Sequence, residues 1–255
     1  MDFVVLGSGT SVPHGARSSS GYWIETPAGS LLLDCSASAI HRMAQEGLDW
    51  PRLDAIWISH FHLDHCGGLA PFLFGTKYAP EMQRRTQPLT IFGAPGIRKL
   101  IENFDNAHNY RLMQQPFPIY ITEVDTLEKF SILPDLEAST FSTPHTEESH
   151  AIHLTNGLGK AMVYSGDTGF SKPLAEFAKN CDLFVLECSF VKDKPVNTHL
   201  ELAEAIFLVR FADPKRAVLT HFYPEWDAVD FSTEVSRFSP KCDVIEATDG
   251  LGISL

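Results

Sequence analysis

The sequence predicts an α/β fold in which two mixed β-sheets pack together and helices cover their outer faces. The first observation behind this prediction is that short apolar runs of strand length recur along the chain, mostly bounded by Gly, Pro or Asp. The second is that the fewer segments with helical apolar spacing fall between groups of these runs. A single αββα domain over residues 1–255 is therefore expected.

In chain order, the apolar runs predict strands at residues 3–6, 21–24, 30–33, 55–59, 89–92, 119–124, 136–142, 151–154, 161–164, 183–186, 217–219 and 243–246. Helices are expected at residues 38–46, 68–74, 96–106, 173–179 and 200–211. The last helix is the clearest, because Leu202, Ala205 and Val209 form one apolar stripe and Pro214 stops it. The polar segment 77–87 contains Pro80 and is expected to be a loop.

Composition excludes several classes of protein. With 44% hydrophobic residues the chain can bury a core, which rules out a disordered or fibrous protein. It has 20 basic against 32 acidic residues and a net charge of −12, which disfavours extended nucleic-acid binding. The five cysteines have no Cys-x-x-Cys spacing, so no thiolate zinc site is expected. With neither a membrane-length apolar stretch nor a signal-peptide start, we expect a soluble, cytoplasmic protein without membrane partners.

The strongest chemical signal directly follows the predicted strand at 55–59. His60, His62, Asp64 and His65 fall within six residues, and three imidazoles with a carboxylate at a strand end are typical metal ligands. In an extended segment His60 and His62 point the same way, so both can face one cation. A turn at Leu63 would let Asp64 and His65 face a second cation. Imidazole and carboxylate suit zinc, manganese and iron, so the metal stays open.

Three further candidate ligands follow other predicted strands: His145, Asp167 and His221. An aspartate on such a turn can bridge two cations through its two oxygens. Each residue alone would more often be a turn or capping residue. Together they favour one shared rim of ligands, although the residues alone do not sort them into two sites.

The same positions carry a family resemblance. The motifs are Gly7-Ser8-Gly9-Thr10-Ser11, His60-x-His62-x-Asp64-His65, Tyr164-Ser165-Gly166-Asp167-Thr168-Gly169 and Leu219-Thr220-His221-Phe222, together with Arg17, Asp34, His145, Glu187 and His199. On these motifs the chain resembles the metallo-β-lactamase superfamily, and within it the ribonuclease Z-like group. The match runs in order along nearly the whole chain. It implies the metallo-β-lactamase fold and a metal-dependent hydrolase, with a phosphoric diester as the expected substrate.

The resemblance also implies how the ligands are shared between two divalent cations. The first cation is assigned to His60, His62 and His145, the second to Asp64, His65 and His221, with Asp167 bridging. Zn²⁺ is the expected metal, with Mn²⁺ and Fe²⁺ as alternatives. A hydroxide between the cations would attack the phosphodiester, and Asp64 would orient or deprotonate it.

The resemblance assigns the remaining catalytic role to His199, as the acid that protonates the leaving alkoxide, with Glu187 as its supporting carboxylate. The alternative for His199 is a structural histidine beside the following helix. His150, Phe74 and Tyr78 are candidate substrate contacts. For His150 a solvated loop residue is the competing interpretation, and for the two aromatic residues it is ordinary packing.

The sequence departs from ribonuclease Z at the flexible arm that grips transfer RNA. Only a strand pair with a turn at Asn156-Gly157 separates His145 from Asp167. The basic pairs at 84–85 and 98–99 are expected to be solvated. We therefore expect a small phosphodiester or nucleotide substrate.

Several alternatives stay open. Within the enzyme class these are transfer RNA 3′ processing and hydrolysis of a lactone or sulfate ester. A non-catalytic nucleic-acid- or protein-binding module is disfavoured, because all seven candidate ligands are present. The apolar stretch 69–74 is a candidate homodimer face.

Overall fold

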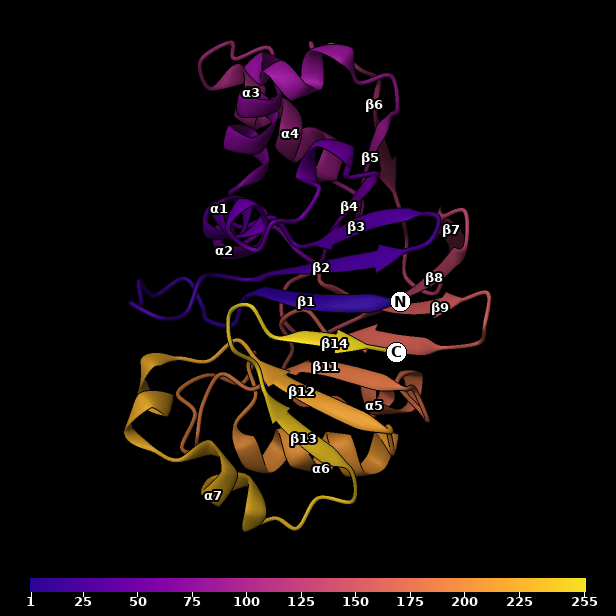
Figure 1. The fold of residues 1–255 in the computed structure, drawn as a ribbon. Coiled ribbons are helices and arrows are strands. Elements are labelled where there is room, and N and C mark those ends of the chain that lie inside the picture. Colours follow the sequence, from indigo (N-terminus) through magenta and orange to yellow (C-terminus); the bar gives the residue numbers. More distant parts are fainter.

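The computed structural model describes residues 1–255 as two seven-stranded mixed sheets flanked by helices (Figure 1). The first sheet has the order β14-β1-β2-β3-β4-β5-β6. Its strands are β1 (Asp2–Gly7), β2 (Gly21–Thr26), β3 (Gly29–Leu33), β4 (Ala55–Ile58), β5 (Leu89–Gly93), β6 (Ile119–Glu123) and β14 (Gly252–Ser254). Strands β3 to β6 are parallel, and β14, β1, β2 and β3 pair antiparallel.

The second sheet has the order β13-β12-β11-β10-β9-β8-β7. Its strands are β7 (Lys129–Leu133), β8 (Leu136–Ser142), β9 (His150–Asn156), β10 (Ala161–Tyr164), β11 (Leu183–Glu187), β12 (Arg216–Thr220) and β13 (Asp243–Glu246). The strands from β7 to β10 pair antiparallel, and those from β10 to β13 are parallel. The fold class expected from the sequence is therefore confirmed.

Helices cover both outer faces, as Figure 1 shows. Those associated with the first sheet are α1 (Ala37–Gln45), α2 (Leu63–Cys66), α3 (Leu69–Tyr78) and α4 (Ile97–Asn106), with the 3₁₀ turns η1 (Trp50–Arg52) and η2 (Pro80–Arg84). In the second half of the chain lie α5 (Lys172–Phe177), α6 (Leu202–Ala212), η3 (Pro224–Ala228) and α7 (Phe231–Ser236). None of these helices combines the length and apolar composition needed to cross a lipid bilayer.

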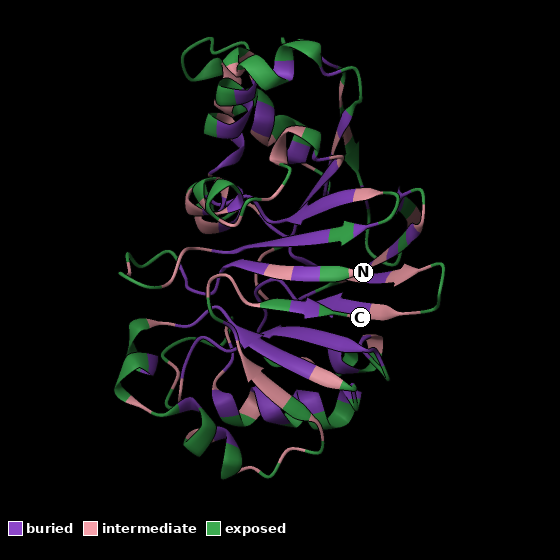
Figure 2. Cartoon of the chain, in the orientation of Figure 1, coloured by how far each residue is buried: buried purple, intermediate pink, exposed green.

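The two cores follow from the alternation of side chains along each strand. Leu31 and Leu33 of β3 point into the core between the sheets, whereas Leu32 packs under the helices of the first sheet. Figure 2 shows the resulting buried runs along the central strands. Because both faces of these strands are covered, they read in the sequence as continuous apolar runs rather than as alternating patterns.

Some sequence expectations need correction. The strands β7 and β14 and the helix α7 were not expected, and residues 63–66 form a helical turn rather than a simple turn at Leu63. The segment 77–87 is not a loop throughout, because α3 continues to Tyr78 and η2 follows. Arg85 is not solvated either. Its buried guanidinium donates hydrogen bonds to the backbone carbonyls of Pro51, Leu53, Gln87 and Pro88.

Strand direction is what positions the candidate site. Parallel strands place their carboxyl ends at the same edge of a sheet, and loops there commonly carry functional residues. The segments after β4, β10, β11 and β12 all leave from such edges. The expected short connection between His145 and Asp167 is also present, since β9 and β10 form a hairpin with its turn at residues 157–158.

Candidate metal centre

The first sheet supplies candidate ligands from one continuous segment. His60 and His62 lie on the extended stretch that leaves β4, and His62 is the N-cap residue directly before α2. Asp64 and His65 lie within α2, where the backbone amide of His65 hydrogen-bonds to the carbonyl of His62 at 3.0 Å. The rings of His60 and His65 remain close, with centroids 4.2 Å apart, so the two ligand sets that this segment supplies lie side by side.

The second sheet supplies its candidates from separate strand ends. His145 follows β8, Asp167 follows β10, and His221 follows β12. His221 has a left-handed backbone with a φ of +61°, a conformation that costs an ordinary residue on the order of 1–3 kcal/mol. The surrounding hydrogen bonds must hold it in place.

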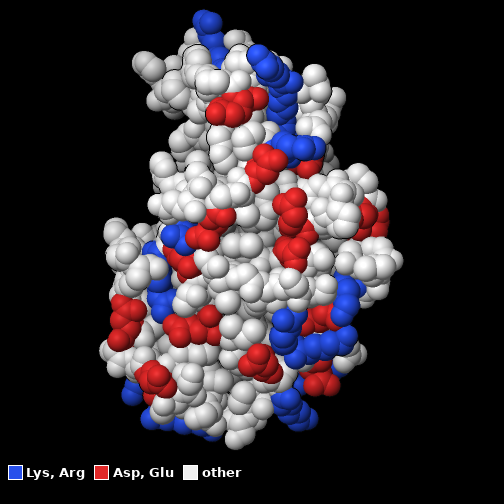
Figure 3. Space-filling model, in the orientation of Figure 1, with Lys and Arg blue, Asp and Glu red and all other residues white.

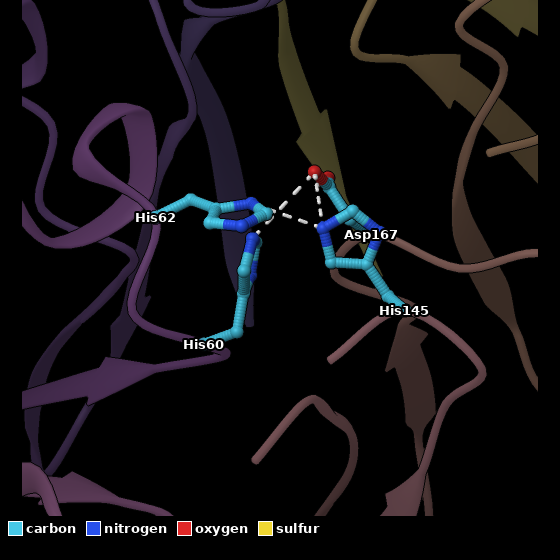
Figure 4. Close-up of side chains that lie close together, drawn as sticks. All are labelled: His60, His62, His145 and Asp167. Atoms are coloured by element: carbon cyan, nitrogen blue, oxygen red, sulfur yellow. Dashed lines mark hydrogen bonds and ion pairs between the residues drawn. The ribbon is translucent and has the colours of Figure 1, made fainter. Parts of the chain in front are cut away.

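The first cluster consists of His60, His62, His145 and Asp167, whose donor atoms all lie within 4.8 Å of one another (Figure 4). Nδ1 of His62 lies 3.0 Å from Nε2 of His145. Oδ2 of Asp167 lies 3.7 Å from Nε2 of His60 and 3.7 Å from Nε2 of His145. His62 is exposed, so this cluster opens to solvent.

The second cluster consists of Asp64, His65 and His221. Oδ2 of Asp64 lies 3.8 Å from Nε2 of His65 and 3.4 Å from Nε2 of His221. The other oxygen of Asp167, Oδ1, lies 3.2 Å from His65 Nε2 and 3.4 Å from His221 Nε2. Asp167 therefore turns one oxygen toward each cluster, which is the geometry of a carboxylate that bridges two cations.

Hydrogen bonds on the outer side of the rings fix which nitrogen faces inward. Nδ1 of His60 lies 3.1 Å from the Ser59 hydroxyl, and Nδ1 of His65 lies 2.7 Å from Oδ2 of Asp34. Similarly, Nδ1 of His145 lies 2.9 Å from the Thr198 carbonyl, and Nδ1 of His221 lies 3.1 Å from the Ser189 hydroxyl. With Nδ1–H donating to these oxygens, Nε2 keeps its lone pair and points inward.

The inward-facing atoms lack partners within the chain. Nε2 of His60, His65 and His221 and Oδ1 of Asp167 are buried and make no hydrogen bond. Buried polar atoms are nearly always satisfied in proteins, so four orphaned atoms in one place indicate a missing partner. Imidazole nitrogen and carboxylate oxygen are preferred ligands of zinc and related divalent cations. The residues therefore fit a pair of such ions.

The protonation states of His60 and Asp167 agree with this fit. Burial and the neighbouring charge of His65 lower the pKa of His60 to about 2, so its ring is neutral. Burial alone would raise the pKa of Asp167, but His221 and His65 outweigh burial and hold this pKa well below its usual range. A neutral imidazole and an ionised carboxylate are the forms that bind metal. Burial opposes the charged ring of His65, but Asp167 and Asp34 outweigh it and raise the pKa of His65 well above its usual value, so a cation bound there would displace a proton.

His199 lies beside both clusters but belongs to neither of the two ligand sets described above. Its ring is 4.8 Å from the ring of His145 and 5.4 Å from that of His221, and its side chain is 12% exposed. Nδ1 of His199 lies 2.9 Å from Oε1 of the buried Glu187. Burial opposes the charged ring, but the hydrogen bond and charge of Glu187 outweigh it and raise the pKa of His199 to about 9.

The three predicted substrate contacts lie in different surroundings. His150 is not a solvated loop residue, because it begins β9, is 5% exposed, and hydrogen-bonds through its amide to the Ser59 carbonyl. Phe74 and Tyr78 lie on α3, where their rings contact each other, and Phe74 also contacts Tyr110. Contact of any of them with substrate stays a prediction.

Sequence reasoning named Tyr223 as a candidate stacking residue but missed its partner Phe190 and the residues that orient the ligands. The position of Asp34 at the end of a predicted strand was a signal that could have marked it as a supporting residue. No sequence pattern marks Ser59, Ser189 or the Thr198 carbonyl. Tyr223 stacks on Phe190 with ring centroids 4.7 Å apart. Its ring lies 6.4 Å from His199 and 6.5 Å from His221, so this pair forms an aromatic wall beside the candidate centre.

Comparisons with known proteins identify the family of this chain. The family model described as Anti-Pycsar protein Apyc1 matches residues 1–244. The ribonuclease Z of Halalkalibacterium halodurans is 26% identical, over 93% of this chain and 92% of that protein. The ribonuclease Z of Salinibacter ruber is 34% identical over 125 residues, which span 49% of this chain and only 37% of that protein.

Two solved structures share the fold. The metallo-β-lactamase fold protein YhfI from Bacillus subtilis has a TM-score of 0.81 at 20% identity and covers 99% of both chains. Zn²⁺-bound PqqB from Methylobacterium extorquens has a TM-score of 0.79 at 18% identity and covers 100% of both. The expected resemblance is confirmed: this protein is a metal-dependent hydrolase of the metallo-β-lactamase fold and belongs to the Anti-Pycsar protein Apyc1 family.

Proposed function

We propose that this protein is a dinuclear metal-dependent phosphodiesterase that acts on a small phosphodiester, such as a cyclic nucleotide or a short nucleotide ester. The observation that carries the proposal is the placement of Asp167, which turns one oxygen toward each of two ligand clusters. The ribonuclease Z relatives support attack on a phosphodiester.

In this proposal one cation is held by His60, His62 and His145, the other by Asp64, His65 and His221, and Asp167 contacts both. Zn²⁺ is the proposed metal, because the donor set suits it and PqqB with the same fold is Zn²⁺-bound. The cations would supply Lewis-acid activation of water and charge neutralisation at the phosphodiester.

The chain's own residues supply orientation and protons. The neighbouring His221 and His65 outweigh burial and hold the pKa of Asp64 below its usual range. Asp64 therefore stays ionised and accepts a hydrogen bond from the attacking water. Because Nδ1 of His199 is committed to Glu187, its Nε2 is the atom that gives a proton to the leaving alkoxide. The raised pKa keeps His199 charged at neutral pH.

The small substrate is favoured over transfer RNA by two features. The connection from His145 to Asp167 is formed by the β9–β10 hairpin and carries no inserted RNA-gripping arm. Basic and acidic side chains are interspersed on the face drawn in Figure 3, where no continuous basic track is seen. Phosphate-backbone binding depends on such tracks.

A substrate panel tests the proposal. Purified protein with measured metal content would be assayed against bis(p-nitrophenyl) phosphate, cyclic nucleotides, dinucleotides, precursor transfer RNA, a lactone and a sulfate ester. We expect about two metal ions per chain and turnover of the small phosphodiesters. Cleavage of precursor transfer RNA alone at physiological salt would favour 3′ processing. One metal or none, without turnover after zinc or manganese is added, would exclude the dinuclear enzyme.

We also propose a homodimer formed through the outer face of α3. A cavity of about 270 Å³ there is lined by Ala70, Pro71, Phe74, Tyr110 and Leu112, and the Phe74 and Tyr78 side chains beside it are exposed. Sedimentation analysis should give a dimer for the wild type and a monomer for Phe74→Glu. A monomeric wild type would exclude this arrangement.

A further inference from the structure

The left-handed backbone of His221 is held from both sides by neighbouring segments. The amide of Phe222 donates to the carbonyl of Ser8 at 2.9 Å, and the amide of Tyr223 donates to the carbonyl of Ser189 at 3.1 Å. Gly9 also forms a bridge with Phe222. The segment at Ser8 is therefore one of the two supports that stabilise the left-handed backbone of His221, a conformation that is unfavourable for an ordinary residue.

Asp249 holds the segment at Ser8 in place through hydrogen bonds. Its Oδ1 accepts hydrogen bonds from the amide of Ser8 at 3.0 Å and from the hydroxyl of Ser8 at 2.9 Å. Its Oδ2 accepts from the amide of Ser18 at 2.8 Å. One carboxylate from the C-terminal region thus joins both ends of the 8–18 loop, whose Ser8 carbonyl holds the residue after His221. Bonds to an ionised acceptor are about twice as strong as neutral ones.

Arg17 supports the residue after His221 through its contact with the Phe222 ring. Its guanidinium carbon lies 4.8 Å from the centroid of the Phe222 ring. The same group donates to Glu246 Oε1 at 2.8 Å, to the Ala247 carbonyl at 3.1 Å and to the Ser8 hydroxyl at 3.4 Å. Its side chain is only 12% exposed and its hydrogen bonds go to the chain itself, so it braces the loop.

These contacts reach only one of the two ligand clusters. His60 and His62 leave β4 on the first sheet, and His145 is oriented by the Thr198 carbonyl. None of the contacts of Arg17 or Asp249 involves those three residues. We propose that Arg17 and Asp249 are positioning residues that aim His221 at the second cation and so set the affinity of that site alone. The inference rests on the proposed dinuclear centre but on no particular substrate.

Cobalt titration of metal-free protein tests the inference. The variants are Asp249→Asn, Arg17→Leu and the milder Arg17→Lys, which keeps a charge for Glu246 but loses the planar group over Phe222. The matched control is Asp182→Asn, a carboxylate that also accepts a backbone amide but lies at the opposite ends of β10 to β12. Visible absorption of Co²⁺ reports each binding step, elemental analysis counts the metal, and thermal unfolding of the metal-free protein reports the fold.

We expect the first Co²⁺ to bind the Asp249→Asn and Arg17→Leu variants as it binds the wild type. The second should bind about 10- to 100-fold more weakly, the usual effect of losing a residue that orients a ligand. Arg17→Lys should be intermediate, and Asp182→Asn should match the wild type.

Equal weakening of both steps, or two unchanged steps, in folded variants would overturn the inference. A general loss of fold would instead lower the unfolding temperature of the metal-free protein and weaken both steps. Should Arg17→Leu fail to fold, Arg17→Lys and Asp249→Asn decide the question. A wild type that binds only one Co²⁺ would overturn the dinuclear centre itself, whereas two tight steps without phosphodiesterase activity would overturn only the proposed reaction.

Discussion

The two ends of the parallel strands β10, β11 and β12 differ in how their polar groups are satisfied. At the amino ends, Asp182 accepts hydrogen bonds from the Ala161 amide at 2.9 Å, Lys160 at 3.2 Å and Lys215 at 2.6 Å. At the carboxyl ends, Asp167 and His221 leave buried atoms without partners. The chain completes its own hydrogen bonding at one end and leaves the other to a bound group. We therefore expect changes at the amino ends to affect stability and those at the carboxyl ends to affect chemistry.

The largest effect is expected for Asp167→Ala, which removes the only residue that faces both clusters. Metal content should fall from two ions per chain to below one, and turnover should fall by at least about 10⁴-fold. The metal-free variant should be less stable than metal-free wild type at neutral pH, because the ionised carboxylate that His221 and His65 stabilise in the folded chain is lost. Elemental analysis, kinetics and thermal unfolding check these outcomes. Two retained metals with normal turnover would contradict the bridging role.

The second prediction concerns His199→Ala, which should keep both metals but lose about 10²- to 10⁴-fold in turnover. The loss should be greatest for substrates with poor leaving groups, since these need the proton most. The exposed His108→Ala is the control and should behave as wild type. Loss of a metal ion from His199→Ala would instead make His199 a ligand, which its distance to Asp167 and His221 permits.

The third prediction compares two aspartates of the first sheet, again at opposite strand ends. Asp34 follows β3 and accepts from His65, whereas Asp54 precedes β4 and accepts from the Ser30 amide at 3.0 Å. Asp34→Asn should weaken the cation site at His65 about 10- to 100-fold. Asp54→Asn should leave metal binding unchanged. Equal metal affinities in the two variants would show that the strand end at which an aspartate lies does not decide whether it supports metal binding.

The smallest effect is expected for Asp182→Asn. Burial opposes ionisation, but Lys215, the Ala161 amide and Lys160 outweigh it and lower the pKa of Asp182 to about 2 in the folded chain. Because this pKa is depressed, the stabilisation is complete above the usual value near 4 and disappears as pH falls through about 2. At neutral pH the unfolding temperature should fall by no more than about 4 °C, without loss of activity. An equal fall at pH 2 and pH 7 would contradict the assignment.

The strands were predictable where a short apolar or alternating run marks them in the sequence. The predicted strands at 136–142, 161–164 and 243–246 have the same bounds as β8, β10 and β13. The unexpected β7 and β14 are edge strands with exposed residues. Such strands owe their form to pairing with a neighbour, as Asp2 pairs with Ser254, and that neighbour lies far away in the sequence.

The candidate site, like the fold, was predictable from the sequence only in part. His60, His62, Asp64 and His65 were recognisable together because their spacing along one short segment already brings them near each other. The partners that orient the rings were not, because His145 meets the carbonyl of Thr198, a group that every residue carries. No side-chain pattern can mark such a contact.

The sequence alone determined the fold class, the family resemblance and the kinds of ligand, because apolar periodicity and residue chemistry are local properties. Only the tertiary structure decided that Asp167 turns one oxygen to each cluster, that Asp34 and Ser189 orient the rings, and that Arg17 braces the loop of His221. Those facts depend on contacts between distant segments. Such contacts arise only when the two sheets pack and bring the strand ends together.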